Sequence, residues 1–192
     1  MRGDKKERIL RVLLSNKEKI SKNELAKRAE CTRPWVIKYL RQLEEKGFVK
    51  NIEVIDKKSL IEYWISIHKK PKKIIKFMVK NPLKLLEKTK LDYALTTYHA
   101  ENIINHYLFP SRVDIYIKEE DLEKWHNLLT ENGFVGGGNM TLRITDSHVL
   151  YGKQKLKKLW LVSNAQLIID LWLENGSCRE AAEMILKNVS RY

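Results

Sequence analysis

Side chains suited to contacting a nucleic acid lie close together between Thr32 and Gln42. Arginine can form two hydrogen bonds to guanine, glutamine can read adenine, and lysine chiefly anchors phosphates. Amide groups at the start of a helix also suit a phosphate. The spacing therefore predicts a DNA-contacting surface, and its candidate residues are Thr32, Arg33, Trp35, Lys38, Arg41 and Gln42.

Other reactive residue types indicate neither metal nor covalent chemistry. His99 and His106 share one face of an expected helix but have no third ligand nearby, so a structural role is favoured. Gly136-Gly137-Gly138 lacks the Gly-Lys-Ser/Thr ending of a phosphate loop and precedes a strand, which favours a turn. Cys31 and Cys178 belong to no Cys-x-x-Cys pair and are expected to be reduced. We expect no catalytic residue, metal or cofactor.

The elements that would position the contact residues follow a helical period. Ile9, Leu10, Leu13 and Leu14 form one apolar stripe of a first helix. Ser21, with Glu24 three residues later, predicts the capped start of a second helix that ends near Glu30. Thr32 is expected to cap a third helix, with Pro34 in its first turn and Gly47 at its end. A strand from Phe48 to Val54 would add a wing.

The third helix has two unlike faces at 100° per residue. Val36, Ile37, Leu40 and Leu43 cluster on one side and should pack on the first two helices. The DNA-contacting candidates lie opposite, and Trp35 among them either packs under the wing or touches DNA. Asp56-Lys57-Lys58 is expected to form a wing tip or a helix start, and either places Lys57 and Lys58 near the DNA backbone.

The stretch from Ser21 to Val49 resembles the winged-helix repressor pattern, and the resemblance covers about Lys5 to Val54. Charge agrees with it. The formal net charge is +13, but residues 1–90 hold 26 Lys plus Arg against 11 Asp plus Glu, a balance of +15. Residues 91–192 have a balance of −2. Excess positive charge confined to one half is typical of a nucleic-acid-binding module joined to a nearly neutral one.

A basic turn around Pro71 divides the chain. We expect a winged helix-turn-helix over residues 1–68, a basic linker over 69–73 and a small α/β domain over 74–192. The fold class is therefore α+β. The expected second-domain elements are strands 74–79, 92–97, 112–118, 140–146, 148–152 and 156–162, and helices 82–89, 99–107, 119–131, 164–174 and 177–188.

The segments Leu91–Ala100 and Val113–Ile117 are similar to the core of nucleotidyltransferase-like domains. Such domains place a glycine turn after a strand and then two carboxylates, in an Asp-x-Asp pattern, that hold Mg²⁺. Here Thr96-Thr97 replaces the glycines, and Tyr116 stands where the second carboxylate would follow Asp114. The resemblance implies a degenerate nucleotidyltransferase-like domain without catalytic activity.

The two modules together, with Asn164–Leu171 and a final helix from Arg179 to Leu186, look like the AbiEi antitoxin group of type IV toxin–antitoxin systems. That resemblance implies a transcriptional autorepressor that binds double-stranded DNA and counteracts a nucleotidyltransferase-like toxin. The alternative is an active nucleotidyltransferase carried to nucleic acid by its winged helix.

Two further expectations concern assembly and location. A homodimer would supply two recognition helices, although tandem winged helices or cooperative monomers would also serve. No apolar run is long enough for a membrane span, and the N-terminus lacks a signal-peptide pattern, so we expect a cytoplasmic protein.

Overall fold

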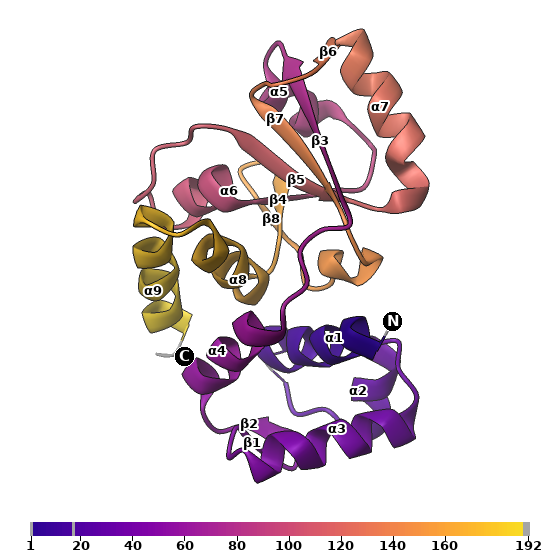
Figure 1. Cartoon of the computed structure of the whole chain (residues 1–192), viewed down its shortest axis with the longest axis vertical. Coiled ribbons are helices and arrows are strands. Elements are labelled where there is room, and N and C mark those ends of the chain that lie inside the picture. The colour runs from indigo at the N-terminus through magenta and orange to yellow at the C-terminus, as the bar shows by residue number, and fades with distance from the viewer. Residues whose placement is uncertain (1, 17, 190–192) are drawn as a thin grey trace.

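The computed structural model describes residues 2–16 and 18–189 and shows two parts joined by a short loop that leads into a strand of the second part (Figure 1). The N-terminal part is a four-helix unit with a small hairpin. Its elements are α1 (Arg2–Ser15), α2 (Lys22–Arg28), α3 (Arg33–Glu45), β1 (Val49–Lys50), β2 (Glu53–Val54) and α4 (Lys57–Ile67).

Local signals account for the ends of these helices. The hydroxyl of Ser21 accepts a hydrogen bond from the backbone N–H of Glu24, which confirms the predicted cap of α2. Gly47 follows α3 with φ of +74°, a conformation that L side chains rarely adopt. Thr32 occupies the predicted N-cap position of α3, but its hydroxyl makes no capping hydrogen bond.

The wing differs from the single strand predicted over residues 48–54. The chain turns at Asn51, where φ is +60°, and two antiparallel two-residue strands result. Lys57 and Lys58 then lie in the first turn of α4, which Asp56 caps through the N–H of Ser59. The helix-start alternative is therefore correct, and the wing tip consists of Asn51 and Ile52.

The C-terminal part contains a seven-stranded mixed sheet in the order β6-β3-β7-β5-β4-β9-β8. Its strands are β3 (Lys73–Val79), β4 (Ala94–Thr96), β5 (Val113–Ile117), β6 (Gly133–Val135), β7 (Met140–Ile144), β8 (Gln154–Leu156) and β9 (Leu159–Leu161). Its helices are α5 (Pro82–Lys88), α6 (Thr97–Ile104), η1 (Glu119–Asp121), α7 (Leu122–Glu131), η2 (Ser147–Leu150), α8 (Asn164–Glu174) and α9 (Ser177–Val189). The first residue of β3, Lys73, is the last residue of the predicted linker.

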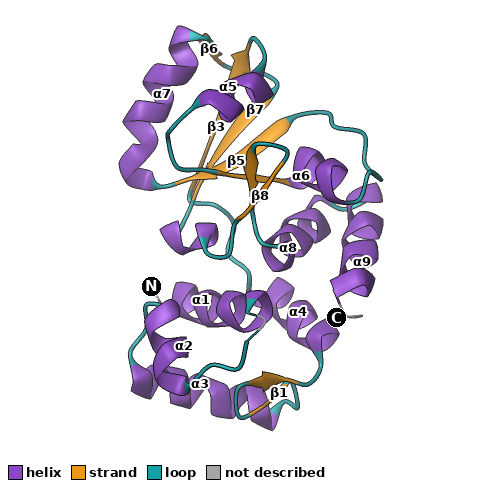
Figure 2. Ribbon diagram, turned by 180° about the vertical axis from the view of Figure 1, so that it is seen from behind, coloured by secondary structure: helices purple, strands orange, loops and turns teal. Residues whose placement is uncertain are grey.

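Helices cover both faces of this sheet (Figure 2). The ring of Phe77 on β3 contacts His126 of α7, whereas the hydroxyl of Tyr116 on β5 donates to Asp170 of α8. The strand register places Phe77 and Tyr116 on opposite faces, so α7 and α8 lie on opposite sides. The arrangement confirms an α+β chain with a mixed α/β second part.

Four second-domain predictions need correction. Residues 148–152 do not form a strand, because the segment instead folds as the 3₁₀ helix η2. Residues 156–162 are not one strand, because the chain reverses at Lys157 and Lys158, both with positive φ, to give the β8–β9 hairpin. Strand β6 was not predicted. The strand expected over 92–97 is limited to β4, and helix α6 begins at Thr97, before the expected start.

Polar contacts join α1 to the second part. The guanidinium of Arg8 donates two hydrogen bonds to the carboxylate of Asp146, at 2.6 and 2.7 Å. Buried Arg11 donates to the side-chain oxygen of Gln166 at 2.9 and 3.1 Å, and lies 3.0 Å from Nδ1 of His148. The other ring nitrogen of His148 lies 2.8 Å from the carbonyl oxygen of Arg28 in α2. Segment η2 and α8 therefore fix the orientation of the helix-turn-helix.

Candidate nucleic-acid interface

The outer face of α3 carries most of the predicted DNA-contacting residues. Arg33, Lys38, Arg41 and Gln42 are all exposed, whereas Val36, Tyr39, Leu40 and Leu43 are buried against the other helices. Tyr39 belongs to the inner face and was not predicted, although it lies three residues from Val36 and four from Leu43. Ile37, predicted to be buried, is only partly covered.

The four exposed side chains are free to bind a ligand. Within residues 2–16 and 18–189, none of them forms a hydrogen bond or an ion pair with another side chain or with the backbone. Four unpaired polar or basic side chains that share one helix face form a surface suited to base edges and phosphates. The exposed hydroxyl of Thr32 lies at the start of the same face.

Trp35 packs against the protein core instead of projecting from this face. Its ring is partly buried against the apolar residues of the core, and its indole N–H is buried with no acceptor among the described residues. An unpartnered buried N–H costs free energy, so the ring is held there by its apolar contacts. Its packing excludes a freely projecting indole and favours the packing alternative.

The two lysines predicted near the wing occupy different environments. Lys58 is exposed and lies 3.9 Å from Glu62, one turn farther along α4, whereas Lys57 is partly buried. The wing tip instead presents exposed Lys50 and Asn51, which were not among the predicted contacts. The sequence does contain a turn signal at Asn51, since asparagine tolerates the left-handed conformation of a tight turn.

A family model described as an HTH domain matches residues 5–60. That range spans α1 to the first turn of α4 and includes all of α3. The match supports assignment of the N-terminal part to DNA-binding helix-turn-helix domains. No curated protein and no solved structure matches the chain.

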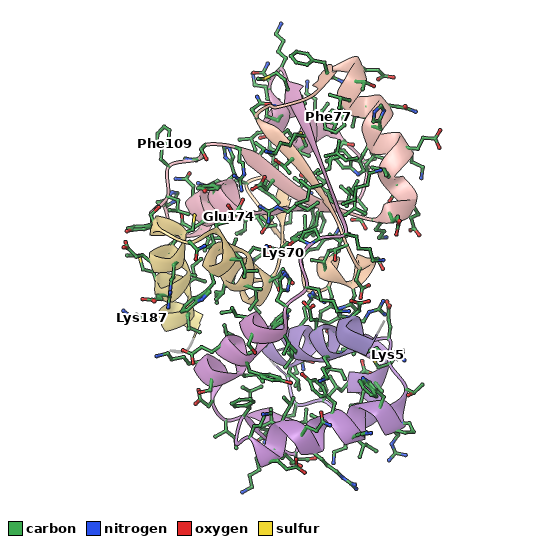
Figure 3. All side chains as sticks on the ribbon, viewed as in Figure 1. Lys5, Lys70, Phe77, Phe109, Glu174 and Lys187 are labelled. Carbon is green, nitrogen blue, oxygen red and sulfur yellow. The ribbon has the colours of Figure 1, made fainter. Side chains whose placement is uncertain are left out.

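A second concentration of charge lies inside the C-terminal domain around Asp114. Its buried carboxylate accepts hydrogen bonds from the hydroxyl of Thr97 at 2.6 Å, from Arg112 at 2.8 Å and from Arg143 at 3.0 Å. Glu174, at the end of α8 (Figure 3), accepts a 2.7 Å hydrogen bond from each of the same two arginines. The result is a closed cluster of two carboxylates and two guanidinium groups.

The electrostatics of this cluster favour the ionised form of Asp114. Burial alone raises the pKa of its carboxyl group, but Arg143, the Thr97 hydroxyl and Arg112 together hold that pKa below its usual value. The cluster does not fit a divalent cation, because two guanidinium groups already neutralise the carboxylate that would have to bind it. No group of three His, Cys, Asp or Glu residues in the described part of the chain could hold a metal ion.

Tyr116, two residues after Asp114, belongs to a neighbouring buried network. Its hydroxyl donates to Asp170 at 2.9 Å, and Asp170 also accepts from Thr96 at 2.5 Å and Gln166 at 2.8 Å. The two networks meet at the Thr96-Thr97 pair. Thr97 has φ of +53°, which is strained for a β-branched residue, and its hydrogen bond to Asp114 helps to hold it there.

Proposed function

We propose that this protein is a transcriptional regulator that recognises double-stranded DNA through α3. The observation that carries the proposal is the set of four exposed, unpaired side chains on one face of α3, within the region matched by the HTH family. Arg33 and Arg41 are the candidates for bidentate contacts to guanine, Gln42 for adenine, and Lys38 for phosphate. Lys50 and Asn51 would contact the backbone from the wing.

The test measures binding to the DNA upstream of the protein's own gene by fluorescence anisotropy. Arg33→Ala and Arg41→Ala should each weaken specific binding by about 1–3 kcal/mol, or about 5- to 150-fold. Arg179→Ala is the matched control, because it removes the same charge from an exposed position on α9 and should leave the affinity unchanged. Equal affinities for the control and both α3 variants would contradict the proposal.

We further propose that the second domain does not transfer nucleotides. The support is the pairing of Asp114 with Arg112 and Arg143, together with the Tyr116 phenol at the position of a second carboxylate. The test is incubation with labelled nucleoside triphosphates and Mg²⁺. Product that forms with the natural protein and disappears in Asp114→Asn would instead support the active nucleotidyltransferase.

The AbiEi-like resemblance supports a finer role, that of an autorepressor in a toxin–antitoxin pair. A reporter driven by the protein's own promoter should be repressed by the natural protein and released by Arg33→Ala. A neighbouring gene for a nucleotidyltransferase-like toxin, whose toxicity falls when this protein is co-expressed, would complete the case. Sedimentation with and without operator DNA tests the proposed homodimer.

A further inference from the structure

More than half of the excess positive charge of residues 1–90 lies outside the helix-turn-helix. Residues 1–68 contain 17 Lys plus Arg against 10 Asp plus Glu, a balance of +7, whereas residues 69–90 alone contribute +8. That short stretch contains nine lysines and one acidic residue, Glu87. We call these lysines the lysine strip: Lys69, Lys70, Lys72, Lys73, Lys76, Lys80, Lys84, Lys88 and Lys90.

The fold assigns most of the lysine strip to the second domain. Lys73 and Lys76 lie on β3, Lys84 and Lys88 lie one turn apart on α5, and Lys70 lies on the segment that joins the two parts (Figure 3). The second domain packs on the α1 and α4 side of the helix-turn-helix, away from α3 (Figure 1). The excess positive charge of residues 1–90 is therefore divided between the helix-turn-helix and the start of the second domain.

The lysine strip is exposed and almost entirely unpaired. All nine side chains are exposed. Within residues 2–16 and 18–189, Lys69 alone among them has an ion-pair partner, Asp4, at 3.7 Å. Eight exposed cations that are close together in the sequence and have no carboxylate partners raise the local positive potential, which an external polyanion would neutralise.

The composition of the strip indicates which polyanion fits. Protein–protein interfaces are depleted in lysine and enriched in arginine, and the strip contains no arginine. A second copy of this chain would bring like charges together. Lysine is a mobile point charge that anchors phosphates without reading bases, so the strip suits the backbone of a nucleic acid.

We infer that the lysine strip is a second nucleic-acid-binding surface, which holds the phosphate backbone of duplex DNA independently of sequence. Because the strip and α3 lie on different sides of the helix-turn-helix, the strip contacts a different stretch of DNA from the one that α3 reads. The protein would then bind DNA that flanks the operator, or a separate duplex, while α3 occupies the operator.

The experiment measures binding of a long, non-operator duplex at several salt concentrations. The variant K72Q/K80Q/K84Q/K88Q removes four charges from the strip. The matched control K155Q/K157Q/K158Q/K187Q removes four exposed charges from the β8–β9 hairpin and α9. Each lost phosphate contact should reduce the slope of log affinity against log salt by about 0.9, so the strip variant should lose about three to four units of slope. The control should keep the natural slope.

A short duplex limited to the operator separates this inference from the proposed function. The strip variant should bind it as the natural protein does, whereas Arg33→Ala should bind it weakly. Thermal unfolding and circular dichroism establish that each variant is folded. Equal slopes for the strip variant and its control would overturn the inference, as would retention of an acidic protein, instead of DNA, by the strip.

Discussion

The α3 face and the Asp114 cluster both contain two arginines, yet the two regions use them in opposite ways. Arg33 and Arg41 are exposed and have no partner within the described chain, so their hydrogen-bonding groups remain available. Arg112 and Arg143 each donate to both Asp114 and Glu174. Unpaired groups on a surface can bind another molecule, whereas carboxylates and guanidinium groups that bond to one another within a domain hold a fold together.

The carboxylates of the second domain resemble a metal site in residue type but not in their contacts. Asp114, Glu174 and Asp170 are three carboxylates within one domain, a residue set that could suggest metal-dependent chemistry. Their oxygens instead accept hydrogen bonds from arginine, threonine, tyrosine and glutamine side chains. Substitutions in each region test this difference.

The largest effect is expected from Asp114→Ala. The substitution leaves two guanidinium groups without their buried partner and frees the Thr97 hydroxyl, which should destabilise the fold by about 3–5 kcal/mol. Urea denaturation of the second domain measures this loss. Glu183→Ala, which removes an exposed partner 3.9 Å from Arg179, should cost less than about 1 kcal/mol. A similar small loss for Asp114→Ala would show that its cluster is not structural.

A smaller effect should follow from protonation of His148. The hydrogen bond from Arg11 requires Nδ1 to be an acceptor, so the ring is neutral in the fold. Burial lowers the pKa of His148, and the nearby charge of Arg11 lowers it further. The hydrogen bond to the Arg28 carbonyl raises this pKa, but by less. The unfolded chain therefore binds a proton first as pH falls, and stability should decrease below about pH 6.5 by up to about 1.4 kcal/mol per pH unit.

A pH series of denaturation curves checks this expectation against His148→Gln, which cannot titrate. Burial also lowers the pKa of His99, with the same sign, so only the difference between natural protein and variant reports on His148. Asp146 and Asp114, whose pKa values are lowered, should contribute only at more acidic pH, below about 4. Identical pH profiles for the two proteins would show that folding does not lower the pKa of His148.

These contacts also show where inference from sequence ends. The caps at Ser21 and Gly47 act within a few residues, so the sequence predicts the helix-turn-helix directly. Segment η2 was predicted as a strand because its apolar residues suit one, but it faces Arg11 from a distance of 137 residues in sequence. The β8–β9 turn was missed because lysine at positive φ carries no turn signal.

The Asp114 cluster was only half predictable for the same reason. Its sequence neighbour Tyr116 indicated the loss of a metal site, whereas the other members of the cluster, Arg143 and Glu174, lie 29 and 60 residues from Asp114 in the sequence. Pairing across such separations depends on strand order and helix placement. The outer face of α3, in contrast, depends on a single helix period.

The smallest effect is expected at the N-caps of α2 and α3. Ser21 and Thr32 look alike in the sequence but differ in their contacts. The Ser21 hydroxyl accepts the Glu24 N–H at 3.1 Å, whereas the Thr32 hydroxyl makes no capping bond. Ser21→Ala should therefore lower the free energy of unfolding by about 1 kcal/mol, and Thr32→Ala should change it much less. If Thr32 contacts phosphate, its substitution should instead weaken DNA binding, which Ser21→Ala should leave intact once the protein is folded. Equal stability losses with no change in DNA affinity would return Thr32 to the role of an ordinary cap and remove it from the DNA-contacting face.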